Sequence, residues 1–202
     1  IHASSGRTEQ ASAAFNKALA EHDRLSTRDV LYAEVMLSTV EKKPDTLSRW
    51  AALAKTYPDF FAGTGGFAYV SWRDANRFDD ATLKLADASA SVRNPSRLPS
   101  LHLLGILQLG NDRFEEALRR FSEAESAGFI RTEYHAATLA AQRKAEQAEQ
   151  VLARSPDASP SENPVVASAR TALRTGLLVD RGDVSGARRL LADAGGKAAD
   201  DS

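Results

Sequence analysis

A recurring spacing of large and small apolar residues is the feature that most constrains this chain. A large apolar residue is followed three positions later by a small one, then four later by a large one and three later by a small one. Steps of three and four stay on one helical face, so each quartet predicts the apolar stripe of one α-helix. The quartets are Phe78, Ala81, Leu85 and Ala88; Phe114, Ala117, Phe121 and Ala124; Val184, Ala187, Leu191 and Ala194; and, in part, Ala11, Phe15 and Ala18.

The distances between the quartets indicate an internal repeat. Phe78 and Phe114 lie 36 positions apart, and Phe114 and Val184 lie 70 apart, close to two such steps. A helical repeat of this length predicts a stacked array, in which neighbouring helix pairs bury each other's apolar stripes. The alternative is a non-repeating helical bundle in which the stripes coincide by chance.

Breaks in the helical pattern divide the chain into helix pairs. Proline and glycine clusters mark the breaks, and the clearest is 155–164, with three prolines and three serines. We expect one helical-repeat domain over 1–194. Leu98-Pro99 is expected to lie in the break before the third hairpin, and Gly195-Gly196 to end the last helix. The parts of this domain are a partial repeat at 7–21 and hairpins at about 26–57, 60–91, 98–127, 130–154 and 165–194, followed by a flexible tail at 195–202.

Composition excludes several classes of protein. The net charge is −1, without a basic run, so the chain lacks the electrostatic footprint of a nucleic-acid binder. There is no cysteine, which excludes disulfides and thiolate metal sites. No apolar run reaches the ~18 residues of a membrane helix, so we expect no direct membrane insertion. A cytoplasmic location is favoured and a periplasmic one stays open. The chain begins inside a helical pattern without a methionine, which predicts a piece or processed form of a larger protein.

The residue types that carry chemistry do not form a recognisable site. His102 and His135 lie about one repeat apart and could face each other, but the sequence offers no third metal ligand. The glycine-rich segment 63–66 lacks the ending of a phosphate loop, so a loose helix start or a close helix approach is the more ordinary reading. The chain also lacks the known nucleophile motifs. We therefore expect no catalysis, no cofactor and no metal.

The second-helix quartets resemble the signature of the tetratricopeptide repeat (TPR) family. Leu104-Gly105 is similar to the family's first-helix L-G element, ahead of the quartet that begins at Phe114. Gly182-Asp183-Val184 is similar to the turn before a stripe, and Tyr57-Pro58-Asp59 to the proline that closes a repeat. The resemblance implies an all-α, right-handed α-solenoid of about five helix hairpins, whose first helices line the concave face.

The resemblance also implies which residues meet a partner. Most of the concave positions are apolar and small, which would suit an amphipathic helix, an extended hydrophobic segment or a second copy of the chain in a homodimer. The residues expected to contact a partner are Arg28, Tyr32, Val70, Arg73, His102, Ile106, Tyr134 and Leu173.

These observations predict a non-catalytic protein–protein interaction module. It would bind a peptide or helix segment of another protein, or mediate self-association. By resemblance, we expect it to be the docking or sensory part of a larger bacterial regulatory protein. The alternative is a structural or assembly scaffold of a cell-envelope or export complex.

Overall fold

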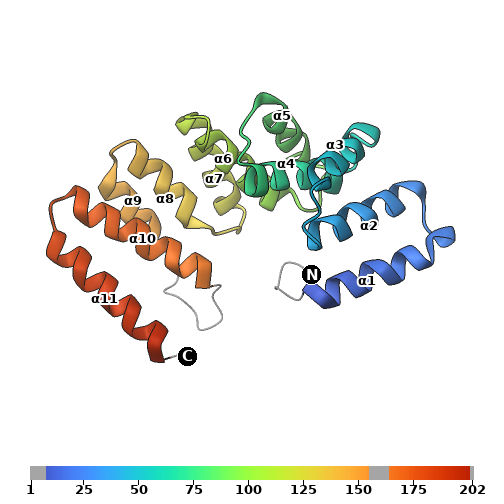
Figure 1. Cartoon of the computed structure of the whole chain (residues 1–202). Coiled ribbons are helices and arrows are strands. Elements are labelled where there is room, and N and C mark those ends of the chain that lie inside the picture. Colours follow the sequence, from blue (N-terminus) through green and yellow to red (C-terminus); the bar gives the residue numbers. More distant parts are fainter. Residues whose placement is uncertain (1–7, 155–163, 201–202) are drawn as a thin grey trace. The chain divides into compact units, whose positions relative to one another are not determined.

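The computed structural model describes residues 8–154 and 164–200, with side chains described for 8–154 and 166–194. These residues form eleven α-helices and one short 3-10 helix, without a strand, as predicted (Figure 1). The predicted loop at 155–164 lies outside the described residues except for Pro164. The helices are α1 (Thr8–Ala20), η1 (His22–Arg24), α2 (Thr27–Val40), α3 (Thr46–Thr56), α4 (Phe61–Ala75), α5 (Asp80–Ser89), α6 (Arg97–Leu109), α7 (Phe114–Ser126), α8 (Thr132–Ala141), α9 (Ala145–Leu152), α10 (Pro164–Asp180) and α11 (Val184–Asp200).

The chain divides into two compact units, and the boundary falls inside α6, between Leu104 and Gly105. In the first unit each helix from α1 to α4 packs on the next one along the chain. In the second unit α7 packs on α8 and α8 on α9, while α10 packs on α8, α9 and α11. Helices close in sequence therefore supply most of the packing, as a helical repeat requires.

Five similar turns mark the hairpins. In each, one residue after the first helix has a positive φ, between 48° and 81°, which ends that helix in a left-handed cap. The next amide N–H donates back to a carbonyl of the helix, as from Lys144 to Leu139 and from Asp183 to Leu178, both at 2.9 Å. The left-handed residues lie 34, 36, 31 and 39 positions apart, in accord with about five hairpins; they are Lys42, Asn76, Asp112, Arg143 and Gly182.

The core of the first unit is built around Trp50. Its indole Nε1 donates to Thr39 Oγ1 at 2.9 Å, which satisfies the ring's one polar group. Gly66 lies so close to the Trp50 ring that a Cβ there would overlap it. The glycine-rich segment is therefore a close helix approach inside α4, and the expectation that it opens the helix loosely is wrong. The buried members of this core are Val35, Trp50, Leu53, Ala54, Phe67 and Val70.

The core of the second unit contains the quartet of α7 as predicted. Ala117, Phe121 and Ala124 are fully buried, and Phe114 is half-buried. Phe121 packs against Gly105, where an added Cβ would lie 2.6 Å from the ring carbon Cε1. A second group of buried residues joins α8, α9 and α10; it consists of Ala136, Leu139, Ala148, Val151, Leu152 and Leu177.

The predicted stripe of α5 is wrong by one residue. Ala81 and Ala88 are exposed, while Thr82, Ala86 and Ser89 are buried. Asp79 caps this helix: its Oδ1 accepts from the Thr82 amide and from the Thr82 hydroxyl, both at 2.9 Å. The helix therefore begins after Asp79, and its buried face starts one position later than the pattern predicts.

Two predicted helix ends are also corrected. α11 continues through Gly195-Gly196 to Asp200, because a glycine inside a helix costs only ~1 kcal/mol and does not by itself end it. Leu98-Pro99 is not a break, because α6 begins at Arg97. Proline is tolerated in a first helical turn, where its missing N–H has no carbonyl to bind.

The contact between Gly66 and Trp50 makes a stability prediction. Gly66→Ala should lower the free energy of unfolding by about 1–3 kcal/mol, because a buried ring must move to admit the methyl group. The control is Gly176→Ala on the exposed face of α10, where a Cβ meets no atom within 4 Å. That change should raise stability by up to about 1 kcal/mol. Urea unfolding of both variants measures this, and equal effects would contradict the assigned packing.

Candidate interaction surface

A hollow of about 730 Å³ lies in the first unit, beside the C-terminal ends of α2 and α4. Its volume falls within the ~300–1,000 Å³ typical of ligand pockets, so it can receive a few side chains of a partner. It is lined by Thr8, Thr39, Val40, Lys42, Lys43, Pro44, Thr46, Leu47, Val70, Arg73, Asp74 and Ala75.

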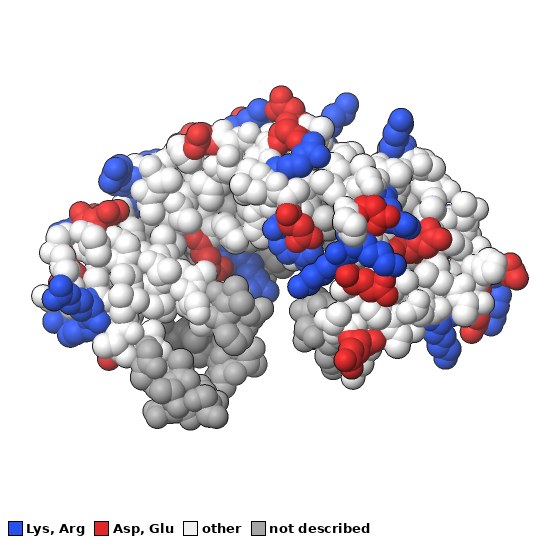
Figure 2. Space-filling view, in the orientation of Figure 1, with Lys and Arg blue, Asp and Glu red and all other residues white. Residues whose placement is uncertain are grey.

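The charged residues around the hollow are mainly basic. Lys42 and Lys43 come from the turn after α2, and Arg73 from the last turn of α4. Asp74 is the one carboxylate that lines the hollow, and Glu41 lies nearby, with Oε2 2.7 Å from Lys43 Nζ. Figure 2 shows lysine and arginine atoms gathered beside acidic atoms over this end of α2.

Arg73 is held in place by two neighbours. Its Nε and Nη2 donate to the Asp74 carboxylate at 2.5 and 2.6 Å, and its guanidinium lies 4.9 Å from the centre of the Tyr69 ring. The hydrogen bonds from Arg73 keep the pKa of Asp74 below its usual range, and the charges of Arg73 and Lys42 lower it further. The same pairing raises the pKa of Arg73, so both groups are ionised at neutral pH.

An aromatic surface continues from Arg73. Tyr69 is exposed, and its ring meets Trp72 edge-on at 5.7 Å between centroids. Exposed aromatic rings beside an arginine are enriched at protein interfaces, because both bury much area at a small cost in conformational entropy.

Arg28 and Tyr32 meet at Phe60, at the other end of α2. The Arg28 guanidinium lies 4.8 Å from the centre of the Phe60 ring, and Nη2 pairs with Asp29 Oδ1 at 2.9 Å. Tyr32 meets Phe60 edge-on at 5.4 Å and Trp50 at 6.1 Å. The structure thus brings these two predicted residues together through a third that the sequence did not single out.

Two of the predicted contact residues are buried, which corrects their assignment. Val70 is 2% exposed and Ile106 is 6% exposed, so their side chains pack almost wholly inside the protein, although Val70 contributes to the lining of the hollow. The physical reason is that α4 and α6 are apolar around most of their circumference. Leu173 is half-buried against the core of α8 and α9, and His102 and Tyr134 are half-buried on α6 and α8.

Polar groups of the second unit are engaged in joining its helices. His135 Nδ1 lies 2.9 Å from Glu125 Oε1, and the imidazole stacks on Phe121. Glu133 of α8 accepts from Arg170 of α10 at 2.6 Å, and both side chains are nearly buried. Each of these pairs links two neighbouring helices. Within the described part of the chain, no three histidine or acidic residues gather as metal ligands, and no helix has the length and apolarity to cross a membrane.

The sequence did not point to Lys42, Lys43, Tyr69 or Phe60 as surface residues. Lys42 and Lys43 precede a proline, and their only sequence signal is that a basic pair follows a predicted helix. Their position beside Arg73 depends on the packing of α2, α3 and α4, which no local pattern specifies.

Comparisons with known proteins define the fold. No protein-family model and no curated protein matches the chain. One similar solved structure is PilF of Pseudomonas aeruginosa, at 18% sequence identity and a TM-score of 0.65, with 94% of this chain and 83% of that chain covered. Another is a putative kinesin light chain from Podospora anserina with TPR-like repeats, at 17% identity and a TM-score of 0.47, with 100% and 92% covered. The likeness to PilF shows the fold, a TPR-like α-solenoid.

Burial of Tyr32 predicts a pH dependence of stability. Burial raises the pKa of Tyr32 above the ordinary value of 10.0. Above about pH 10 the folded chain therefore keeps a proton on Tyr32 that the unfolded chain has lost. The contribution of Tyr32 to the free energy of unfolding is fully present below about pH 10 and is lost as the pH rises through the folded pKa. Relative to Tyr32→Phe, the native chain should lose stability as the pH rises above about 10. Urea unfolding across that range tests this, and parallel curves for the two proteins would contradict it.

Proposed function

We propose that the chain is a protein-interaction module whose hollow beside α2 and α4 holds an acidic segment of a partner protein. The observation that carries the proposal is the group of three cations, Lys42, Lys43 and Arg73, around one hollow of peptide size. A partner carboxylate there would gain charge-assisted hydrogen bonds, and its apolar neighbours could cover Val40, Leu47 and Tyr69.

The arrangement of the three cations supports this proposal. Arg73 is pre-positioned by Asp74 and Tyr69, so binding orders little that is not already ordered. Lys43 is paired with Glu41, whereas Lys42 acts on the Asp74 carboxylate through its charge and has no ion pair of its own within the described residues. Lys42 is therefore the cation best able to accept a new carboxylate.

The fold supports the broader part of the proposal. Stacked helical repeats present extended surfaces assembled from many helices, and these are typically used for binding. The predicted role as the docking or sensory part of a larger bacterial regulatory protein remains a prediction, as does the alternative of an assembly scaffold.

The proposal is tested by binding of a labelled helical 12-residue peptide that contains leucine and glutamate, followed by fluorescence anisotropy. The same peptide with glutamine at each glutamate should bind about tenfold more weakly. Lys42→Gln and Arg73→Gln should each raise the Kd of the glutamate peptide by about three- to tenfold, because each removes a cation from the rim of the hollow.

Lys55→Gln is the matched control, since Lys55 is an exposed lysine of α3 outside the hollow. This variant should leave the Kd of the glutamate peptide within about twofold of the native value. Raising the salt concentration should weaken binding of the glutamate peptide but not that of the glutamine peptide. If Lys55→Gln weakens binding as much as Lys42→Gln does, the attraction is diffuse and the proposed site is wrong.

A further inference from the structure

The two large members of the apolar stripe of α11, Val184 and Leu191, are exposed, although Ala187 between them is buried. Counted from the left-handed turn residue of each hairpin, Leu191 of α11 occupies the position of Phe121 in α7 and Leu152 in α9. Phe121 and Leu152 are 0% and 1% exposed, whereas Leu191 is 52% exposed. Val184, the first member of the same stripe, is 48% exposed.

The inner stripes are buried because another helix lies on them. Leu173 and Leu177 of α10, four residues apart, pack against the buried residues of α8 and α9. On α7 the His135 ring of α8 stacks against Phe121 at 6.1 Å. The surface that α11 presents is therefore the same type of surface that the fold elsewhere covers with the first helix of a hairpin.

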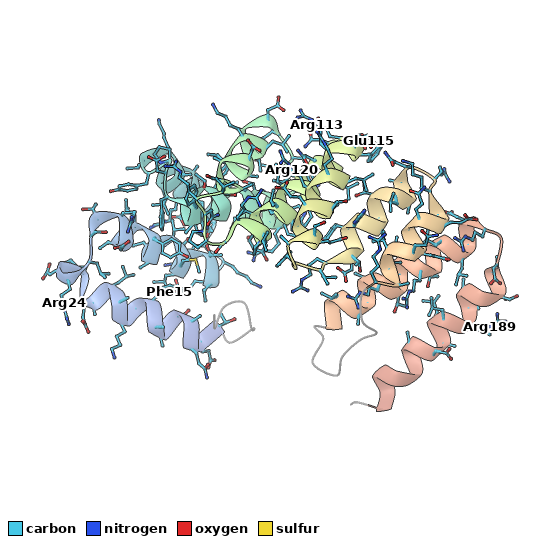
Figure 3. The ribbon with its side chains drawn as sticks, turned by 180° about the vertical axis from the view of Figure 1, so that it is seen from behind. Phe15, Arg24, Arg113, Glu115, Arg120 and Arg189 are labelled. Carbon is cyan, nitrogen blue, oxygen red and sulfur yellow. The ribbon has the colours of Figure 1, made fainter. Side chains whose placement is uncertain are left out.

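Charge distinguishes the α11 surface from the inner ones. Arg181, four residues after Leu177, bonds through Nη1 to Glu149 Oε2 of α9 at 2.7 Å. The position of Glu149 is taken by Arg188 in α11, so the sign of the charge is reversed. Arg189 follows directly, and in Figure 3 its side chain points outward from α11. A helix with the charges of α10 would place arginine against arginine here.

We propose that the exposed members of this stripe, Val184 and Leu191, form a docking site for an amphipathic helix of a partner protein. The helix carries two leucines four residues apart and, four residues after the second, a glutamate or aspartate. The leucines cover Leu191 as Leu173 and Leu177 cover α9, and the carboxylate pairs with Arg188 as Arg181 pairs with Glu149. This surface is separate from the basic hollow of the first unit.

The probe is a fluorescein-labelled peptide that copies residues 164–181 with glutamate in place of Arg181. It should bind the full chain about threefold to tenfold more tightly than the peptide with the natural arginine, because only the glutamate peptide places opposite charges at Arg188. The Arg188→Glu variant of the chain should instead bind the arginine peptide more tightly than the glutamate peptide. Such a reversal reports the pairing itself, which a merely destabilised protein would not produce.

The apolar part of the surface has its own control. Leu191→Glu should raise the Kd of the glutamate peptide about tenfold or more, because it removes the leucine contact. Val92→Glu changes an equally apolar residue that is 83% exposed on the first unit, and it should leave the Kd unchanged.

Three results would overturn the proposal. The first is no binding of the glutamate peptide at about 1 mM, the weakest affinity expected of a specific site. The second is that the Arg188→Glu variant still binds the glutamate peptide more tightly than the arginine peptide. The third is a dimer in sedimentation velocity that Leu191→Glu dissociates, since the occupant of the stripe would then be a second copy of the chain.

Discussion

The structure depends on one constraint: a helix hairpin of this type cannot bury its second helix alone. α9 is buried because α10 crosses both α8 and α9, with Leu177 packed against the core that contains Leu152. On α11, Leu191 occupies the position of Leu152 and is exposed. Stability is therefore shared between neighbouring hairpins.

Small residues set how closely the helices approach. Gly66 admits the Trp50 ring, and Gly105 admits Phe121, so two aromatic side chains pack directly against a neighbouring helix backbone. Such contacts use dispersion efficiently, but they leave no room for an additional methyl group.

Helix type and hairpin number could be predicted from the sequence, because the stripe of α7 and the turn before α11 are local patterns. The apolar spacing predicts the α5 stripe one residue too early, because small polar residues, Thr82 and Ser89, take buried positions that a search for apolar residues passes over. Arg73 was predicted as a surface residue and lines the hollow, but Lys42 and Lys43 were missed. They reach Arg73 only through the packing of three helices, which sequence periodicity does not encode.

The measurement that tests this account most directly is a double-mutant cycle at Gly105 and Phe121, read by urea unfolding. If the ring fills the space that the glycine leaves, Gly105→Ala should cost about 1–3 kcal/mol in the native chain and clearly less in the Phe121→Leu background, where the smaller side chain leaves room for the methyl group. A coupling of about 1 kcal/mol between the two sites is predicted. Additive effects within about 0.3–0.5 kcal/mol would contradict the close approach of α6 and α7 within their hairpin.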